Sequence, residues 1–197
     1  MRKYIFGLLA GIVLMISCNE DQVFTPKPRM YPRVDFFPKA YKEYSNKNCN
    51  FTFEIPTYSE VDTNVKYFEE DPIHPCWFDL NFPDYNGRIY FSYTPVEGEN
   101  TIDKLVTDAF KIASKHNSVA EYREELVIAN DYGVEGVMFK IDGPVASPIN
   151  FYLTDHEERF VRASLYFQKA VQKDSIAPIL KYLEEDIDHL INTFQWK

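Results

Sequence analysis

The sequence predicts an α+β fold: a single domain in which a mainly antiparallel sheet of about six strands is packed by two amphipathic helices. Two segments, residues 101–116 and 175–194, repeat their apolar residues with the period of a helix. The other patterned segments alternate apolar and polar residues and are separated by short turns, which makes them antiparallel neighbours. The 180 residues after residue 17 suit one domain with a substantial core. Because each helix carries one apolar stripe, both should lie flat against the sheet.

Residues 1–17 indicate a signal peptide that ends at a lipidation site. Arg2 and Lys3 precede 13 uncharged residues, the length of a signal core, whereas a spanning helix needs about 20. The run ends in Met-Ile-Ser-Cys, which resembles a lipobox, so Cys18 is the expected site of acylation. Acyl chains on Cys18, palmitate among them, would hold the protein to a membrane. The alternative is an ordinary secretory signal, because Met15 stands where leucine is commoner.

Residues 18–41 are expected to form a lipidated N-terminus and an extended tether, and residues 42–197 a single α+β domain. The tether is polar and contains four prolines, which disfavour a helix and favour an extended chain. These prolines are Pro26, Pro28, Pro32 and Pro38.

The first predicted strands precede the first helix. Residues 51–55 alternate apolar and polar side chains and stop at Pro56, as a half-buried strand does. Residues 77–82 and 88–94 each place three apolar side chains on one face, and the turn residues 84–87 separate them. This pattern predicts a β-hairpin.

The first helix, residues 101–116, has Asn100 or Thr101 placed to cap its N-terminus. The second helix is expected to begin at Ser175 as its cap and to tolerate Pro178 in its first turn. Three or four further strands are expected between the helices, at residues 122–128, 136–141, 149–154 and 160–168. The polar face of the second helix carries Glu184, Glu185, Asp186 and Asp188.

The charge and the cysteines limit the partners and the compartment. The net charge of −9 becomes −11 once Arg2 and Lys3 are removed with the signal, and no basic cluster is present, so nucleic acid is not an expected partner.

In an oxidising periplasm, Cys49 and Cys76 are expected to form a disulfide. The bridge would close a loop of about 27 residues and contribute roughly 3–4 kcal/mol. Two buried free thiols are the alternative.

No pattern in the sequence indicates an active site. It contains no phosphate-binding glycine loop, no GxSxG elbow and no HExxH pair. Asp186 and His189 lie one helical turn apart and could form one edge of a metal site, but solvated helix surface is the favoured interpretation. His156-Glu157-Glu158 has acid and base side chains, yet lies where a polar turn is expected. No catalytic residue, metal or cofactor is therefore expected.

Aromatic residues make up 16% of the chain and could supply either a core or a partner surface. Most of them fall on the inward phase of the predicted strands. Four that do not are the better candidates for an interface, and these are Tyr90, Tyr152, Tyr166 and Trp196.

Seven stretches resemble the gliding motility lipoprotein GldD family of the Bacteroidetes. They are residues 26–31 (PKPRMY), 49–58 (CNFTFEIPTY), 76–93 (CWFDLNFPDYNGRIYFSY), 136–143 (GVMFKIDG), 150–155 (NFYLTD), 159–167 (RFVRASLYF) and 174–178 (DSIAP). In this family a glycine commonly stands where the chain has Met30, a departure confined to the tether. The order of strands and helices also looks like the Mog1/PsbP type of sandwich, which is an analogy of fold alone.

The resemblance implies a cell-envelope lipoprotein required for gliding motility and associated with the type IX secretion apparatus, without established enzymatic activity. It implies two partners: the membrane, through the acyl chains, and envelope proteins of the apparatus. The expected location is the outer membrane, with its periplasmic face favoured over the cell surface.

Three functions follow as hypotheses. The first is a non-enzymatic accessory component of the motility and secretion machinery. The second is a periplasmic chaperone or apolar-ligand carrier, which requires a cavity lined by the inward aromatic residues. The third is an enzyme, which requires carboxylates or histidines to converge in a cleft.

Overall fold

The computed structural model describes residues 34–65, 72, 74–115, 120–167 and 173–197. The predicted signal peptide, Cys18 and most of the predicted tether lie outside these residues. The strands are β1 (Tyr41–Ser45), β2 (Phe51–Pro56), β3 (Glu60–Asp62), β4 (Phe78–Phe82), β5 (Gly87–Pro95), β6 (Tyr122–Ala129), β7 (Glu135–Asp142), β8 (Ile149–Thr154), β9 (Arg159–Phe167) and β10 (Gln195–Trp196). The helices are the short 3₁₀ helix η1 (Pro83–Tyr85), α2 (Ile102–Ser114) and α3 (Lys173–Thr193).

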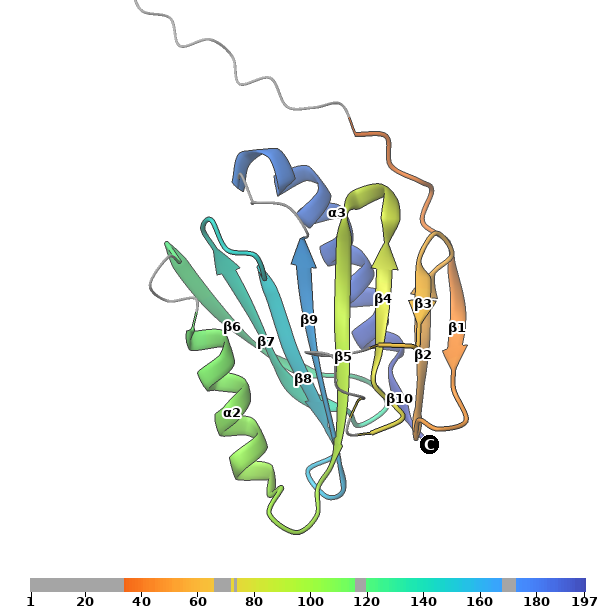
Figure 1. Cartoon of the computed structure of the whole chain (residues 1–197), viewed down its shortest axis with the longest axis vertical. Helices are drawn as coiled ribbons and strands as arrows, with labels where there is room; N and C mark the ends of the chain where they lie inside the picture. The colour runs from red at the N-terminus through yellow and green to blue at the C-terminus, as the bar shows by residue number, and fades with distance from the viewer. Residues whose placement is uncertain (1–33, 66–71, 73, 116–119, 168–172) are drawn as a thin grey trace, which may run out of the picture. The chain divides into compact units, whose positions relative to one another are not determined.

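The described strands form two antiparallel sheets (Figure 1). The large sheet has seven strands in the order β3-β4-β5-β9-β8-β7-β6, and the small sheet has three in the order β1-β2-β10. The α+β class and the predicted β4–β5 hairpin are confirmed. The described strands number ten rather than about six, because β3 and β10 are too short to show a period and β1 lies in a polar stretch.

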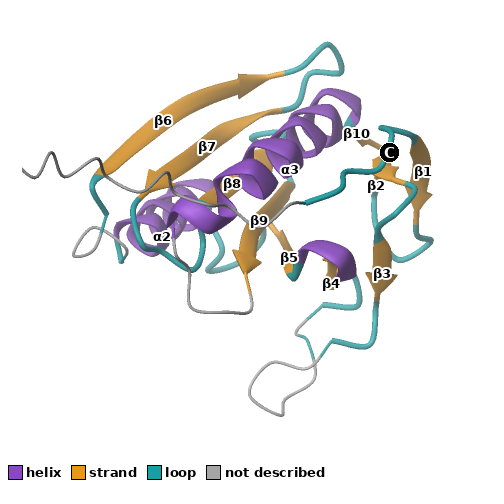
Figure 2. Cartoon of the chain, turned by 90° about the horizontal axis from the view of Figure 1, so that it is seen from above, coloured by secondary structure: helices purple, strands orange, loops and turns teal. Residues whose placement is uncertain are grey.

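The two helices lie on opposite faces of the large sheet. Helix α3 and the small sheet cover one face, here named the α3 face, and Figure 2 shows α3 between strands β6 and β7 and the small sheet. Helix α2 packs on the other face, the α2 face, against β8 and β9. The main core fills the space on the α3 face, as expected for stripes of apolar side chains on alternating strand positions.

Phenylalanine rings make up much of this core. Phe53 of β2 stacks on Phe194 after α3, with ring centroids 5.6 Å apart, and on Phe91 of β5 at 5.7 Å. Phe78 stacks on Phe91 at 4.6 Å. These four side chains are at most 1% exposed, so they join both sheets and the C-terminal segment into one packed interior.

The helix ends partly follow the sequence pattern. Thr101 caps α2 by accepting a hydrogen bond from the backbone N–H of Lys104. Helix α3 instead begins at Lys173, two residues before the expected cap Ser175. Pro178 therefore lies inside the helix rather than in its first turn.

The chain that leads into β1 is fixed to α3 by a buried carboxylate. Asp186 is 1% exposed, so its predicted place on a solvated acidic face was wrong. Lys39 Nζ lies 2.7 Å from its carboxylate, and the Tyr41 and Tyr58 hydroxyls donate hydrogen bonds to it. We name these four residues the Asp186 cluster. Burial, followed by the bond to Asp186, raises the pKa of Tyr41 and of Tyr58.

The neighbours of the Asp186 cluster complete this attachment. Lys39 Nζ also donates to the Tyr182 carbonyl and lies 3.4 Å from the centre of the Tyr182 ring. Burial raises the pKa of Tyr182 to about 12, and its hydroxyl donates to the Phe37 carbonyl. His189, the other half of the suggested metal edge, stacks on Tyr41 and lies 2.6 Å from a carboxylate oxygen of Glu54. Asp186 and His189 thus share Tyr41 as a neighbour, but Asp186 pairs with Lys39 whereas His189 contacts Glu54.

Candidate interaction surface

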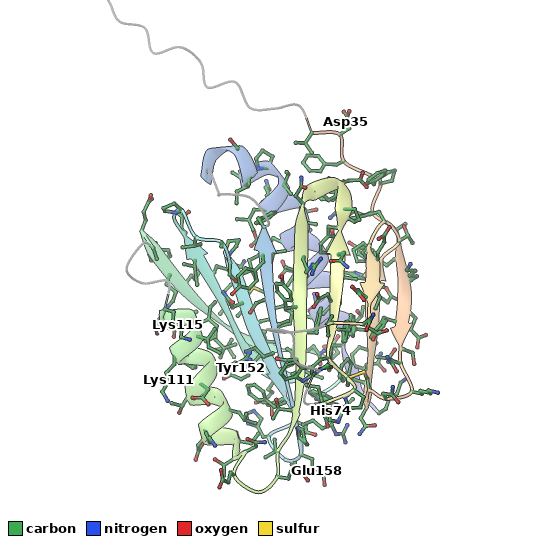
Figure 3. All side chains as sticks on the ribbon, in the orientation of Figure 1. Asp35, His74, Lys111, Lys115, Tyr152 and Glu158 are labelled. Atoms are coloured by element: carbon green, nitrogen blue, oxygen red, sulfur yellow. A yellow bond between two sulfur atoms is a disulfide. The ribbon has the colours of Figure 1, made fainter. Side chains whose placement is uncertain are left out.

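The α2 face of the large sheet is covered by α2 only in part. Helix α2 packs on Phe139, Tyr152 and Phe160, and Figure 3 shows Tyr152 beside the helix. In Figure 1, β4 and β5 pass in front of α3, and neither α2 nor α3 stands before them. Helix α2 contacts β9 as well as β8, so it is the β5 side of this face that neither of these helices covers.

Strand alternation decides which side chains this part of the face presents. Ile89, Phe91 and Leu165 point into the core, so the residues between them point to the α2 face. Cross-strand pairing places Arg88 beside Tyr166, Tyr90 beside Ser164, and Ser92 beside Arg162. We name these six residues the β5–β9 patch. All of them are partly buried.

Two of the four predicted interface aromatics meet in this patch. The rings of Tyr90 and Tyr166 contact edge to face, with centroids 5.2 Å apart. Tyr152, by contrast, is 6% exposed beneath α2. Trp196 packs on Phe51 and Phe194 in the core and carries the Arg159 guanidinium over its ring. Tyr152 and Trp196 therefore serve the packing of the fold.

Arg88 stands at one end of the patch. Its guanidinium forms an ion pair of 3.1 Å with Asp79, whose side chain is 3% exposed, and lies over the Tyr90 ring at 5.7 Å. The Nε of Arg88 is buried and has no hydrogen-bond partner among the described residues. The ion pair thus satisfies this cation only in part.

Arg162 stands at the other end and has no ion pair or hydrogen bond to its guanidinium among the residues described. Burial lowers its pKa, and the charge of Asp108 on α2 opposes that effect. Asp108 itself pairs with Lys111 at 3.2 Å. A partly buried guanidinium without a counter-ion is unfavourable, so this position suits an anion supplied from outside.

Sequence reasoning did not single out Arg88 or Arg162. The alternation of residues 160–168 already puts Arg162 on the polar phase, which was a usable signal. The missing counter-ion, however, depends on the register that sets Ser92 and Tyr152 on either side of Arg162.

The described residues offer no comparable centre for catalysis. Within them, no group of three His, Cys, Asp or Glu side chains could hold a metal ion. His156 lies on the exposed turn between β8 and β9 and contacts Glu135 at 3.0 Å. Glu158 belongs to the same turn (Figure 3). None of the described helices is both long and apolar enough to span a bilayer.

The fold and this surface define a single-domain α+β protein whose candidate site is an interaction surface. The family model described as gliding motility lipoprotein GldD matches residues 21–196. The chain therefore belongs to this family, which makes it a lipoprotein of the cell envelope associated with gliding motility, as the resemblance predicted.

Two further comparisons concern curated sequences and solved structures. No curated protein sequence matches the chain. Among solved structures, the solution structure of cyanobacterial PsbP (CyanoP) from Synechocystis sp. PCC 6803 is similar. That similarity has a TM-score of 0.48 and 11% sequence identity, and it covers 84% of this chain and 98% of the cyanobacterial one.

Proposed function

We propose that the protein is a non-enzymatic accessory component of the gliding motility and type IX secretion machinery, and that it binds an envelope protein of this machinery through the β5–β9 patch. In this proposal the protein comes from a member of the Bacteroidetes. Residues 1–17 are removed as a signal peptide, and Cys18 is acylated and held in the outer membrane. Residues 18–41 form the lipidated N-terminus and tether, and the domain of residues 42–197 stands on the periplasmic side.

The observation that carries the proposal is the unpaired guanidinium of Arg162. The whole chain has a net charge of −9, so an anionic partner needs a local cation such as Arg162 to offset the repulsion. A carboxylate from a partner would give Arg162 the counter-ion that the described residues do not supply, and Ser92, Ser164 and the two tyrosines could contact the same segment. Tyrosine and arginine are also the residues that contribute most at protein interfaces.

The packing of the interior argues against the carrier hypothesis. A carrier would need the inward aromatic residues to line a cavity. Instead, Phe53, Phe78, Phe91 and Phe194 contact one another directly and are at most 1% exposed.

Replacing Arg162 with glutamate should reduce the recovery of motility or secretion components about 30-fold or more, because losing one member of a desolvated charge pair costs at least about 2 kcal/mol of binding. The measurement is cross-linking in intact cells, followed by affinity purification and quantitative mass spectrometry. Lys47→Glu makes the same charge change on the exposed β1–β2 turn and should leave recovery unchanged. Equal recovery with Arg162→Glu and with the wild type, in a variant whose circular dichroism is native, would exclude the patch.

Replacing Cys18 with alanine should move the protein from the membrane fraction to the soluble fraction, because the acyl chains provide the attachment. Fractionation and immunoblotting measure the change. A Ser17→Ala variant, which keeps a small residue before the cysteine, should remain membrane-bound. If the Cys18→Ala protein stays in the membrane fraction after mild washing, the anchor lies elsewhere.

A further inference from the structure

Strand β6 is an open edge of the large sheet. Among the described residues it pairs only with β7 (Figure 2). It is eight residues long, whereas β3, at the opposite edge, has three. A long edge strand leaves a row of backbone donors and acceptors for another chain, which is why proteins usually shorten or block such edges.

The hydrogen-bond register shows which residues of β6 offer these groups. The N–H of Asn130 bonds to the Val134 carbonyl in line with the β6–β7 ladder, and the N–H of Ile141 bonds to the Pro148 carbonyl in line with the β7–β8 ladder. In an antiparallel ladder the hydrogen-bonded pairs alternate, so the even-numbered residues of β6 face β7. The backbone groups of Glu125, Val127 and Ala129 therefore face the open edge.

The side chains around β6 are unusually apolar for a free edge. The described part of the chain has five exposed large hydrophobic residues, and three of them lie on β6 or its following turn: Tyr122 (64% exposed), Val127 (86%) and Tyr132 (54%). The second half of the strand, residues 126–129, carries no charge. The charges that normally protect an edge are thus confined to its first half.

A pocket of about 160 Å³ lies beside this first half. Tyr122 and Glu124 of β6, Lys140 of β7 and Leu180 and Glu184 of α3 contribute to its wall, and Lys140 forms an ion pair with Glu184. Burial lowers the pKa of Lys140, but the bond to Glu184 and the charges of Glu184, Asp188 and Glu124 raise it, so three carboxylates act on one lysine. A basic side chain is the kind that this arrangement would attract.

The pKa of Asp188 also indicates an excess of negative charge beside the pocket. Burial raises the pKa of Asp188, and the charges of Glu184 and Glu185 raise it further, against the opposing effect of Lys140. Glu184, Glu185 and Asp188 therefore lie close enough to act on one another, although Glu185 also lies 4.0 Å from Lys39 Nζ.

We infer that β6 accepts an extended segment of an envelope partner protein as an added strand. The segment places apolar residues against residues 126–129 and a lysine or arginine at the pocket beside Glu124. Main-chain hydrogen bonds to the outward-facing backbone groups hold the segment, and the two halves of the edge select its sequence. This surface involves none of the β5–β9 patch residues, so the inference is independent of the proposed binding at Arg162.

Photo-cross-linking in the native cells tests this inference. Tyr122 and Tyr132, which flank the edge, are each replaced by p-benzoylphenylalanine, a conservative change for an exposed aromatic residue. Both positions should cross-link to one partner, within a single segment of about ten residues, because an extended chain advances about 3.3 Å per residue. That segment should contain a basic residue near the Tyr122 cross-link.

Substitutions on β6 distinguish strand addition, which needs main-chain hydrogen bonds, from binding through side-chain contacts alone. Val127→Pro removes an outward N–H without breaking the β6–β7 ladder, and it should lower both cross-link yields about tenfold or more. Val127→Thr keeps the N–H and should preserve them. Glu124→Arg, a second variant that leaves the backbone intact, should lower the yield at Tyr122.

Four outcomes would overturn the inference. These are full yields in a folded Val127→Pro variant, full yields in Glu124→Arg, cross-links scattered over unrelated proteins or lipids, and cross-links between two copies of this chain. Persistence of the cross-links in Arg162→Glu would show that the two surfaces act separately, whatever the outcome for the β5–β9 patch.

Discussion

Replacing Lys39 with methionine should lower the free energy of unfolding by about 2–4 kcal/mol, because it leaves the Asp186 carboxylate buried without its cation. The carboxylate is 1% exposed and lies 2.7 Å from Lys39 Nζ. Lys39 is 26% exposed, and the Tyr41 and Tyr58 hydroxyls would still donate to Asp186, so the expected loss lies below the upper end for a fully buried pair. Chemical denaturation of the purified protein measures it.

A double-mutant cycle separates the charge effect from lost packing. Asp186→Asn removes the carboxylate charge, so adding it to Lys39→Met should restore about 1–2 kcal/mol of the loss. Lys42→Met makes the same change on the exposed side of β1 and should alter stability by less than about 0.5 kcal/mol. If the double variant is no more stable than Lys39→Met alone, the buried charge is not what Lys39 stabilises.

The Asp186 cluster also lies where the proposed membrane tether joins the domain. Lys39 and Tyr41 stand where the predicted tether enters the domain, and their bonds to Asp186 fix that entry point on α3. If Cys18 carries the proposed lipid, the cluster fixes the point at which the lipid-linked tether is attached to the domain. Lys39→Met should therefore loosen this attachment before it disturbs the sheets.

The strands and helices that could be predicted from the sequence are those long enough to show a period. Residues 77–94 alternate over two full strands around a turn, and the structure has the β4–β5 hairpin there. Helix α2 was predicted from its apolar stripe and a cap at Asn100 or Thr101, and the structure has Thr101 as the cap. Strand β1 was not predicted, because its residues belong to a polar stretch whose pairing with β2 depends on tertiary contacts.

The candidate sites depend on contacts between residues far apart in the chain. Tyr90 and Tyr166 could each be predicted to face outward, but their contact depends on the β5–β9 register. Asp186 looked solvated in its helix, because the Tyr41 that covers it stands 145 residues away. Local patterns show which way a side chain points, whereas its partners follow from the topology of the whole sheet.

Removing the Cys49–Cys76 bridge should lower the free energy of unfolding by about 3.5 kcal/mol, the chain-entropy value for a loop of 27 residues. The bridge has a particular position: Cys49 precedes β2 of the small sheet, and Cys76 precedes β4 of the large sheet. Without it, the two sheets are held together by side-chain packing and noncovalent contacts. Both sulfurs are buried, so Cys49→Ala with Cys76→Ala should also lose some packing.

Comparing reductant with substitution isolates the covalent contribution. Reductant should shift the denaturation midpoint of the wild type toward that of the double-alanine variant and leave the variant itself unchanged. Cys49→Ala alone should behave like the double variant, because one cysteine cannot form the bridge. The opposite result has two parts: the wild-type midpoint does not respond to reductant, and all thiols of the unfolded wild type react with a thiol reagent. That result would mean that no disulfide joins the sheets. The shared phenylalanine core would then be a main source of the packing between them.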